Sequence, residues 1–239
     1  DFLSIKFQQD GYSMKKMIRF ILMSEAFRRS AKPNDEAKKI DPNNIYLSHF
    51  PIRRLEAEAI RDGLLAVSGK LDSTMYGPPV PAYITSFMNG RGKPAESGPI
   101  DGLGRRSIYL EVRRNFLDPM MTTFDRPIPF TAFGKRNVTN VPAQSLILMN
   151  DPFVVLQAEN MTKKLLANKQ LSFDNRINWI YRKALSRPAK PEEIIAAKGL
   201  MEQLAAGYKI KAGTWNDDPT IWKDYIHSVF NFKEFIYLN

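Results

Sequence analysis

The sequence contains no cysteine, and this absence excludes several kinds of chemistry. Without thiols the chain has no disulfides, no thiolate nucleophile and no cysteine-bound metal. Its two histidines, His49 and His227, are far apart in sequence, so we do not expect a histidine-based zinc site. The haem-attachment motif Cys-x-x-Cys-His is also missing. We therefore expect this chain to bind no metal and no cofactor of its own.

Long apolar runs are absent too. None approaches the roughly 20 residues that a bilayer-crossing helix needs, so we expect no membrane insertion. The chain begins at Asp1 with neither an initiator Met nor a signal peptide. We expect it to be a fragment of a larger protein. The glycine-rich stretches at 89–92 and 102–106 have the wrong spacing for a phosphate-binding loop or a dinucleotide fingerprint.

The overall balance of charge is basic. Lys and Arg number 35 against 25 Asp and Glu, which gives a net charge of +10. The favoured interpretation is that lysines solvate helix surfaces, and the alternative is an anionic partner. Because no five-residue basic run and no aromatic-studded RNA-binding strand occurs, nucleic acid is the weaker candidate among such partners.

Apolar periodicity predicts a mainly α fold, an irregular array of about seven helices with long loops and a small two-stranded β element. The strand candidate is 106–114, where Ile108, Leu110 and Val112 alternate with polar residues. We expect 1–239 to form a single helical domain with lobes at 1–76 and 105–239. The Pro- and Gly-rich stretch 77–104 would be a loop insertion between them. The expected helices cover 13–29, 51–67, 174–185 and 191–207, with others starting at Pro142, Pro152 and Pro219.

The second of these helices has an unusual set of charges that we predict to form a structural ion network. Its members are Arg54, Glu58, Arg61 and Asp62. They form either an exposed ladder of i,i+4 pairs or a polar latch to an arginine-rich element elsewhere, and the sequence leaves both open. Four arginines bracket the strand candidate: Arg105, Arg106, Arg113 and Arg114. We favour pairing of their guanidinium groups with Glu58 and Asp62 over the binding of an anion.

The irregular stretch 120–157 is the best candidate for specific binding, because polar loops held between helices often carry function. Within it, Thr139 or Asn140 and then Asp151 are expected to cap the helices that start at the following prolines. The remaining candidate for a binding segment is therefore 124–136. We predict a binding surface made of Arg105, Arg106, Tyr109, Arg113, Arg114, Phe124, Asp125, Arg126 and Arg136. Tyr109, Phe124 and Phe130 would be its stacking platforms.

Several short phrases resemble, in order, one bacterial family: the C-terminal domain of unknown function in planctomycete-type multidomain proteins that also carry cytochrome c domains. The matching phrases are MIR at 17–19, SEAFR at 24–28, RLEAEAIRD at 54–62, LAVSG at 65–69, RRSIYL at 105–110, FDRP at 124–127, TNVPAQSL at 139–146, LMNDPF at 148–153, LSRP at 185–188 and NFKEFIYL at 231–238. The resemblance implies an extracytoplasmic location, periplasmic or at the cell surface, cytochrome c-type domains as partners in the same polypeptide, and a setting of polysaccharide utilisation. It implies no established activity.

Three functions remain open at this point. The first, which we favour, is a non-catalytic binding or scaffolding module that contacts anionic polysaccharide. The second is a glycan hydrolase with a carboxylate pair drawn from Glu58, Asp62, Glu111 and Asp125. Neighbouring arginines would lower the pKa values of such carboxylates, which does not suit a general acid. The third is a nucleic-acid-binding module, which charge alone supports.

Overall fold

A computed structural model of the chain describes residues 1–211 and 213–238. These residues form eleven α-helices and one two-stranded antiparallel sheet, so the predicted mainly α class is confirmed. The chain divides into two compact units, residues 1–54 with 237–239 and residues 55–236. The expectation of one domain with lobes split at 77–104 stays a prediction. Among the described residues, no helix is long and apolar enough to cross a membrane.

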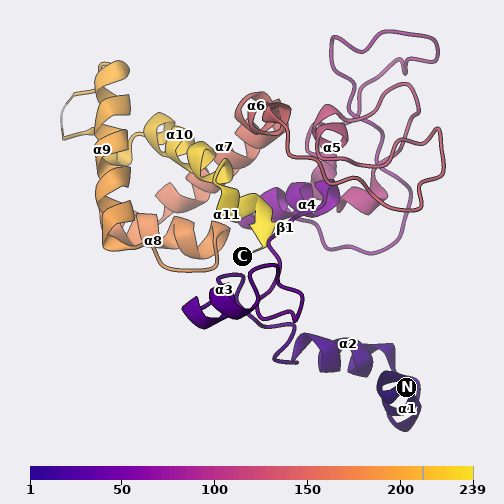
Figure 1. The fold of residues 1–239 in the computed structure, drawn as a ribbon. Coiled ribbons are helices and arrows are strands. Elements are labelled where there is room, and N and C mark those ends of the chain that lie inside the picture. The colour runs from indigo at the N-terminus through magenta and orange to yellow at the C-terminus, as the bar shows by residue number, and fades with distance from the viewer. Residues whose placement is uncertain (212, 239) are drawn as a thin grey trace. The chain divides into compact units, whose positions relative to one another are not determined.

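The first unit consists of short helices and the sheet (Figure 1). Its elements are α1 (Phe2–Gln9), α2 (Met14–Leu22), α3 (Asp35–Ile40), β1 (Arg53–Arg54) and β2 (Tyr237–Leu238). In the sheet, Arg53 lies opposite Leu238 and Arg54 opposite Tyr237. Ser13 caps α2, because its side chain accepts a hydrogen bond from Lys16 N. None of α1, α2 and α3 contains a buried residue.

The second unit is built on three helices that bury their apolar faces together. These are α4 (Ala57–Ser68), α7 (Pro152–Ala167) and α10 (Pro219–Phe230). Helix α7 packs along α10 on one side and against α4 on the other. Helix α4 ends where Gly69 adopts a left-handed conformation, with φ of +70°. Large side chains such as Trp222, Phe230 and Met161 are fully buried in the core between these helices.

The remaining helices of this unit are α5 (Pro119–Thr123), α6 (Pro142–Asn150), α8 (Phe173–Ala184), α9 (Pro191–Gly207) and α11 (Lys233–Ile236). One arginine ties three of them together. The Arg187 guanidinium donates to Glu193 at the start of α9, with distances of 2.7 and 2.8 Å, and to Glu234 of α11, with distances of 2.6 and 2.7 Å. It also lies 5.2 Å from the ring of Tyr181 in α8. This clamp fixes the C-terminal turn on the helical core.

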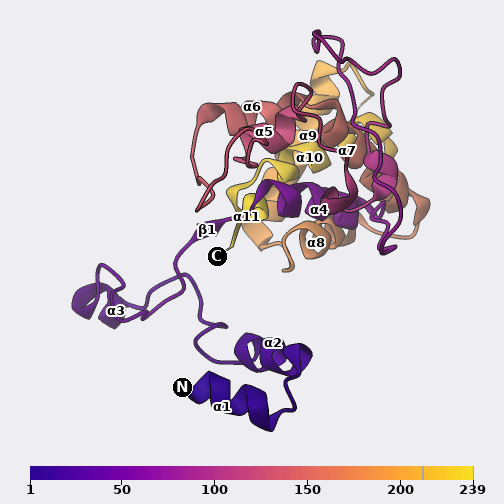
Figure 2. The same cartoon turned by 90° about the vertical axis from the view of Figure 1, so that its right-hand side faces the viewer.

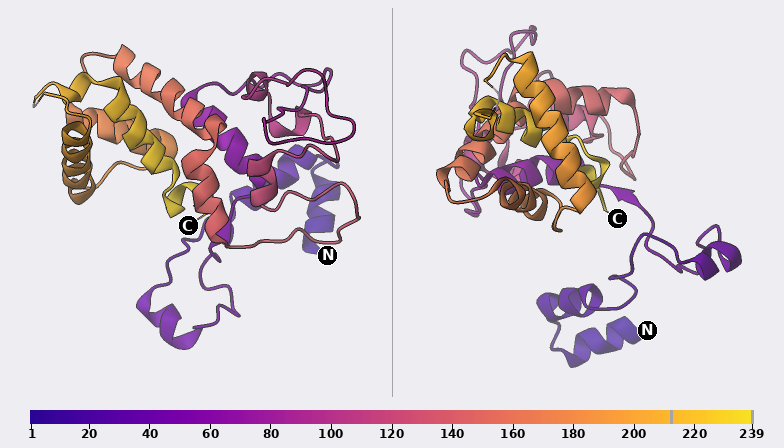
Figure 3. Two further views of the ribbon diagram at one scale, coloured as in Figure 1. Left: turned by 90° about the horizontal axis from the view of Figure 1, so that it is seen from above. Right: turned by 90° about the vertical axis from the view of Figure 1, so that its left-hand side faces the viewer.

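Long loops join α4 to α6 and lie on the opposite side of the unit from α9 (Figures 1 and 3). The predicted strand at 106–114 is wrong: Ser107–Tyr109 forms a short 3-10 helix, and β pairing is limited to isolated bridges such as Val80 with Leu110. The reason is long-range. The Ser107 N–H and hydroxyl both donate to Asp62 of α4, at 2.8 and 2.7 Å, and this turns the chain. The sheet forms instead at β1 and β2.

Candidate functional site

The candidate site lies beside α4, where Arg61 is buried with 3% exposure. Its guanidinium donates to the carbonyl oxygens of Asp101, at 2.7 Å, and Arg105, at 2.9 Å. A Cβ added at Gly102, whose φ is +61°, would lie 2.5 Å from this guanidinium, so the loop can approach it closely only as glycine. Arg61 therefore holds the loop 101–107 against α4.

Part of the predicted ion network forms, because Arg61 Nη1 lies 3.5 Å from Asp62 Oδ1, while other contacts of its members go to residues outside the network. Asp62 accepts from Ser107, and Glu58 accepts two hydrogen bonds from Arg136, at 2.7 and 3.1 Å. Arg54 lies in β1, before α4 begins, so the four charges do not share one helix face. A latch from α4 does form, and its arginine is Arg136.

The pairing with Arg136 also fixes the charge state of Glu58. Burial alone would raise the pKa of the Glu58 carboxyl, but the hydrogen bonds from Arg136, and the more distant charge of Arg126, bring this pKa below its ordinary value. The same contact raises the pKa of Arg136 against the opposing effect of burial. Both groups are ionised at neutral pH, and Glu58 is unsuited to act as a general acid.

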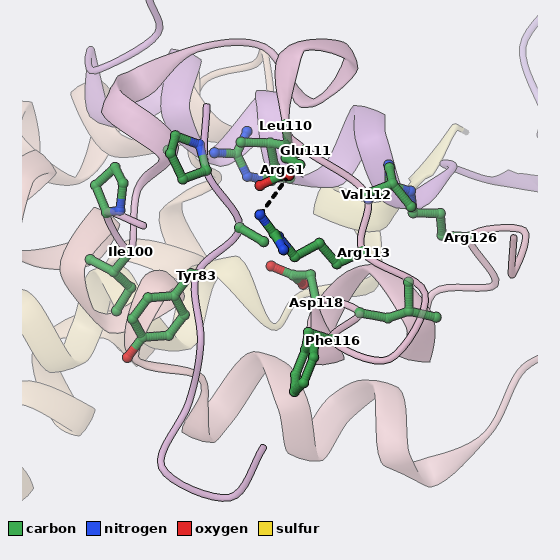
Figure 4. A pocket seen from close by; sticks show the side chains of 15 residues that line it. Arg61, Tyr83, Ile100, Leu110, Glu111, Val112, Arg113, Phe116, Asp118 and Arg126 are labelled. Carbon is green, nitrogen blue, oxygen red and sulfur yellow. Dashed lines mark ion pairs between the residues drawn. The ribbon is translucent and has the colours of Figure 1, made fainter. Parts of the chain in front are cut away.

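A small, partly open space, which we name the inner cavity, lies between α4, the loops 81–83 and 99–102, and the segment 110–118 (Figure 4). Arg61 lines it, together with Asp118, Arg126 and the ion pair of Arg113 with Glu111, which is 3.0 Å long. Its volume is about 30 Å³, enough for one or two water molecules and far too small for a sugar ring. The inner cavity is therefore a charged interior space and not a substrate cleft.

A more open space, which we name the arginine hollow, lies beside it. It is lined by Thr122, Asp125, Arg126, Pro127, Ile128, Phe133, Arg136 and Asn137, and its volume is about 180 Å³. This matches the segment 124–136 that the sequence singled out. Two guanidinium groups, an amide and the partly exposed ring of Phe133 line one concave surface. Such a set can hold a carboxylate or sulfate group beside an apolar surface.

Arg126 is the distinctive member of the arginine hollow, because it lines the inner cavity as well. Its backbone N–H is bonded to the Met121 carbonyl at 3.0 Å. Its guanidinium makes no hydrogen bond, ion pair or ring contact with any residue of 1–211 or 213–238. A half-buried guanidinium with five donors and no partner is a group to which an anion can add bonds without displacing any.

The structure places three other predicted site residues in a separate cluster. Tyr109 lies under the guanidinium groups of Arg105, at 4.4 Å, and Arg106, at 5.9 Å, and its hydroxyl accepts from Tyr76 N at 2.9 Å. Arg105 pairs with Asp72 at 3.8 Å. These arginines thus have partners other than the expected Glu58 and Asp62. Arg114 is exposed and lines neither the inner cavity nor the arginine hollow.

Two predicted roles in 124–140 require correction. Phe124 is 1% exposed and belongs to the core, so it is no stacking platform; Phe130 and Phe133 are the exposed aromatic rings of this segment. Thr139 does not cap α6, whose N-cap residue is Val141. It donates instead from its N–H and hydroxyl to Asp125, at distances of 2.8 to 3.0 Å. The bond fixes one edge of the arginine hollow.

The four carboxylates proposed for hydrolysis all have partners: Arg136 for Glu58, Ser107 for Asp62, Arg113 for Glu111 and Thr139 for Asp125. The carboxylates proposed for hydrolysis did not include Asp151, whose pKa is raised by burial and by the charge of Asp118. Asp151 caps α7 as predicted, with a bond of 2.8 Å from Phe153 N. No cluster of three or more metal-ligating side chains occurs in the described part of the chain.

Comparison of the sequence with protein-family models gives a match that covers most of the chain. The model described as "Protein of unknown function (DUF1553)" matches residues 1–201, most of the chain. This agrees with the resemblance to a domain of unknown function that the ordered phrases indicated. Searches of the curated proteins and of the solved structures each gave no match.

Proposed function

The chain belongs to the DUF1553 family of proteins of unknown function, and from this premise we propose that it is a non-catalytic module that binds acidic polysaccharide in the arginine hollow. The observation that carries the proposal is the guanidinium of Arg126, which lines the hollow without a hydrogen-bond or ion-pair partner among the described residues. Every neighbouring carboxylate named above is already bonded. Two arginines and one aspartate line the hollow, which leaves one excess positive charge, and the Arg126 donors have no acceptor among the described residues.

The chemistry of the wall favours an oxyanion as the bound group. A guanidinium can donate two parallel hydrogen bonds to a carboxylate or sulfate, and each charge-assisted bond is stronger than a neutral one. Arg136 has its own carboxylate partner, but its side chain is 37% exposed and faces the same hollow. Arg126 would make the direct contact, and Arg136 would add to the local positive charge.

The size and openness of the hollow favour a polymer over an enclosed small molecule. Sites that bury a drug-sized ligand usually measure about 300–1,000 Å³, and this hollow is smaller and open. It suits one charged substituent while the sugar to which it is attached rests on the surface. Phe133 and Phe130, 46% and 55% exposed, offer apolar faces for neighbouring rings.

We propose the same setting that the resemblance implies. The module would belong to a larger secreted protein, extracytoplasmic and joined to cytochrome c-type domains, and would keep that protein on an acidic polysaccharide. The net charge of +10 supports association with such a polymer over long range.

The test compares two matched variants on a panel of polymers. Arg126→Gln removes the unpartnered guanidinium, and Arg114→Gln removes an exposed one outside the hollow. Binding is measured by calorimetry against heparin, polygalacturonate, neutral dextran and duplex DNA at one ionic strength. We expect binding to an acidic glycan, none to dextran, and a roughly 10–100-fold loss in Arg126→Gln, because a hydrogen bond to a charged group is worth about 1.5–3 kcal/mol.

Arg114→Gln should weaken binding only slightly, since it changes net charge without changing the hollow. Equal losses of affinity in the two variants would indicate that the interaction is nonspecific charge attraction, and this would contradict the proposal. Equal or tighter binding to DNA would favour the nucleic-acid alternative. Release of reducing sugar from any glycan of the panel would favour the hydrolase.

A further inference from the structure

Helices α1 and α2 form a hairpin (Figure 2). Its large apolar side chains are exposed to an unusual extent. Neither helix has a buried residue. The apolar side chains that are more than a third exposed are Phe2, Leu3, Ile5, Tyr12, Met14, Ile18, Phe20, Ile21, Leu22, Met23 and Phe27. Patches of this kind mark interaction surfaces.

Helix α2 is amphipathic, and its three polar residues are all basic. At 100° per residue, Met14, Ile18, Ile21 and Leu22 form one stripe. Lys15 and Arg19 follow at one border of the stripe, Lys16 lies opposite it, and the helix contains no acidic residue. None of these three cations forms an ion pair within the residues described here. Long cationic side chains in these positions can reach outward while the stripe is buried.

A shallow groove of about 490 Å³ follows the hairpin and adds to this pattern. It is lined by Lys6, Asp10, Lys16, Arg19, Phe20, Met23 and Ser24. Lys6 is partly neutralised by Asp10, 3.2 Å away, and lies 5.1 Å from the centre of the Phe20 ring. The groove therefore combines excess positive charge with apolar surface.

From these features we propose that the α1–α2 hairpin adsorbs to an anionic lipid surface, lying in the interface without crossing it. A short helix with large apolar residues on one side and Lys and Arg on the other is typical of interfacial binding to anionic lipids. The groove beside it would take lipid headgroup phosphates.

The positive charge of the hairpin argues against two other partners, a second copy of the chain and its own second unit. Residues 1–54 carry 11 Lys and Arg against 6 Asp and Glu, a net +5, and the other 185 residues carry 24 against 19, also +5. A second copy of the chain, or its own second unit, would bring like charge to the cationic hairpin. The partner must be anionic and apolar at once.

The two helices of the hairpin differ in how their apolar residues are distributed. Phe2, Leu3, Ile5 and Phe7 are spread around α1 and form no single stripe. Interfacial binding needs a helix with one apolar face and one charged face, and α2 has both. Helix α2 would therefore make the main contact with the lipid surface.

The experiment measures co-sedimentation of the chain with two kinds of vesicles, phosphatidylcholine alone and phosphatidylcholine with phosphatidylglycerol. We expect binding to the anionic vesicles only, weakened by salt. Ile18→Asp should reduce the partition coefficient at least tenfold. The control Ile195→Asp, at a position on α9 that is 72% exposed, should leave it unchanged. Lys15→Gln with Lys16→Gln should reduce it about 25-fold, because each cation near an anionic surface contributes roughly fivefold.

All substituted positions except Ile195 lie on α2, which has no buried residue, so circular dichroism should show an unchanged fold. Equal binding to both vesicles, or wild-type binding by Ile18→Asp, would overturn the proposal. Self-association of the wild type that Ile18→Asp abolishes would assign the surface to a second copy and overturn it too. The Arg126→Gln variant should bind vesicles normally, which keeps this test separate from that of the glycan site.

Discussion

Arg61 offers the sharpest test of how the site is held together. Replacing it with Met removes a buried guanidinium, 3% exposed, that donates to Asp101 O and Arg105 O. Both carbonyls would lose a charge-assisted hydrogen bond, and a methionine of similar length cannot replace either. Each such bond contributes about 1.5–3 kcal/mol, so we expect a loss of about 3–5 kcal/mol in the free energy of unfolding.

The assay is equilibrium unfolding in guanidinium chloride, followed by tryptophan fluorescence. All three tryptophans of the chain lie in the second unit, which contains Arg61. Arg182→Met, at an exposed position of α8, is the matched control and should change stability by less than about 0.5 kcal/mol. A loss below about 1 kcal/mol in Arg61→Met, at an unchanged slope, would refute the role of Arg61 as the anchor of loop 101–107.

Other predictions use the same assay. The hydrogen bonds from Arg187 hold the pKa of Glu193 at about 2, below its usual 4.5, so the stability from this pair is complete above pH 4.5 and is lost as pH falls toward 2. Between pH 5 and 2 the free energy of unfolding should fall by up to about 3 kcal/mol more in the wild type than in Arg187→Ala. Parallel curves of stability against pH for the two proteins would contradict the clamp. Asp151→Ala should lower the free energy of unfolding by less than about 1 kcal/mol, which is at the low end for a lost helix cap. The loss is small because burial of this carboxylate offsets its hydrogen bond from Phe153 N. A loss above about 2 kcal/mol would assign Asp151 a larger role. Gly69→Ala should cost about 1–2 kcal/mol, since φ is +70° there, and a stabilising effect would rule out that conformation.

The elements that the sequence predicted well are those with local signals. Helices α6, α7 and α10 begin at Pro142, Pro152 and Pro219, and α9 spans 191–207 as expected. In each case a proline at the first position sets the start, and apolar periodicity carries the helix onward. For α7 and α10 an aspartate immediately before the proline caps the helix as well.

The elements that it predicted poorly depend on partners far along the chain. Alternation at 106–114 is a genuine strand signal, but Asp62, 45 residues earlier, turns the backbone at Ser107. The bonds between Arg136 and Glu58 span 78 residues, so the sequence could indicate a latch on α4 without identifying its partner. Phe124 gives no local sign that it is buried, because its neighbours are polar and prolines follow closely.

The candidate site shows the same division. A polar segment with arginines marked 124–136, and this segment does line the arginine hollow. The sequence does not indicate that Arg126 lacks a partner while Arg136 is paired, because both facts depend on contacts in three dimensions. The same holds for the separate cluster of Arg105, Arg106 and Tyr109.

The most direct test of glycan binding is chemical protection of Arg126. Phenylglyoxal modifies accessible guanidinium groups, and mass spectrometry reports the rate at each arginine with and without saturating heparin. Our account predicts that heparin slows modification of Arg126 at least several-fold while Arg114 reacts at nearly its free rate. Equal protection of both arginines, or protection of Arg114 alone, would contradict the assignment of the arginine hollow as the binding site.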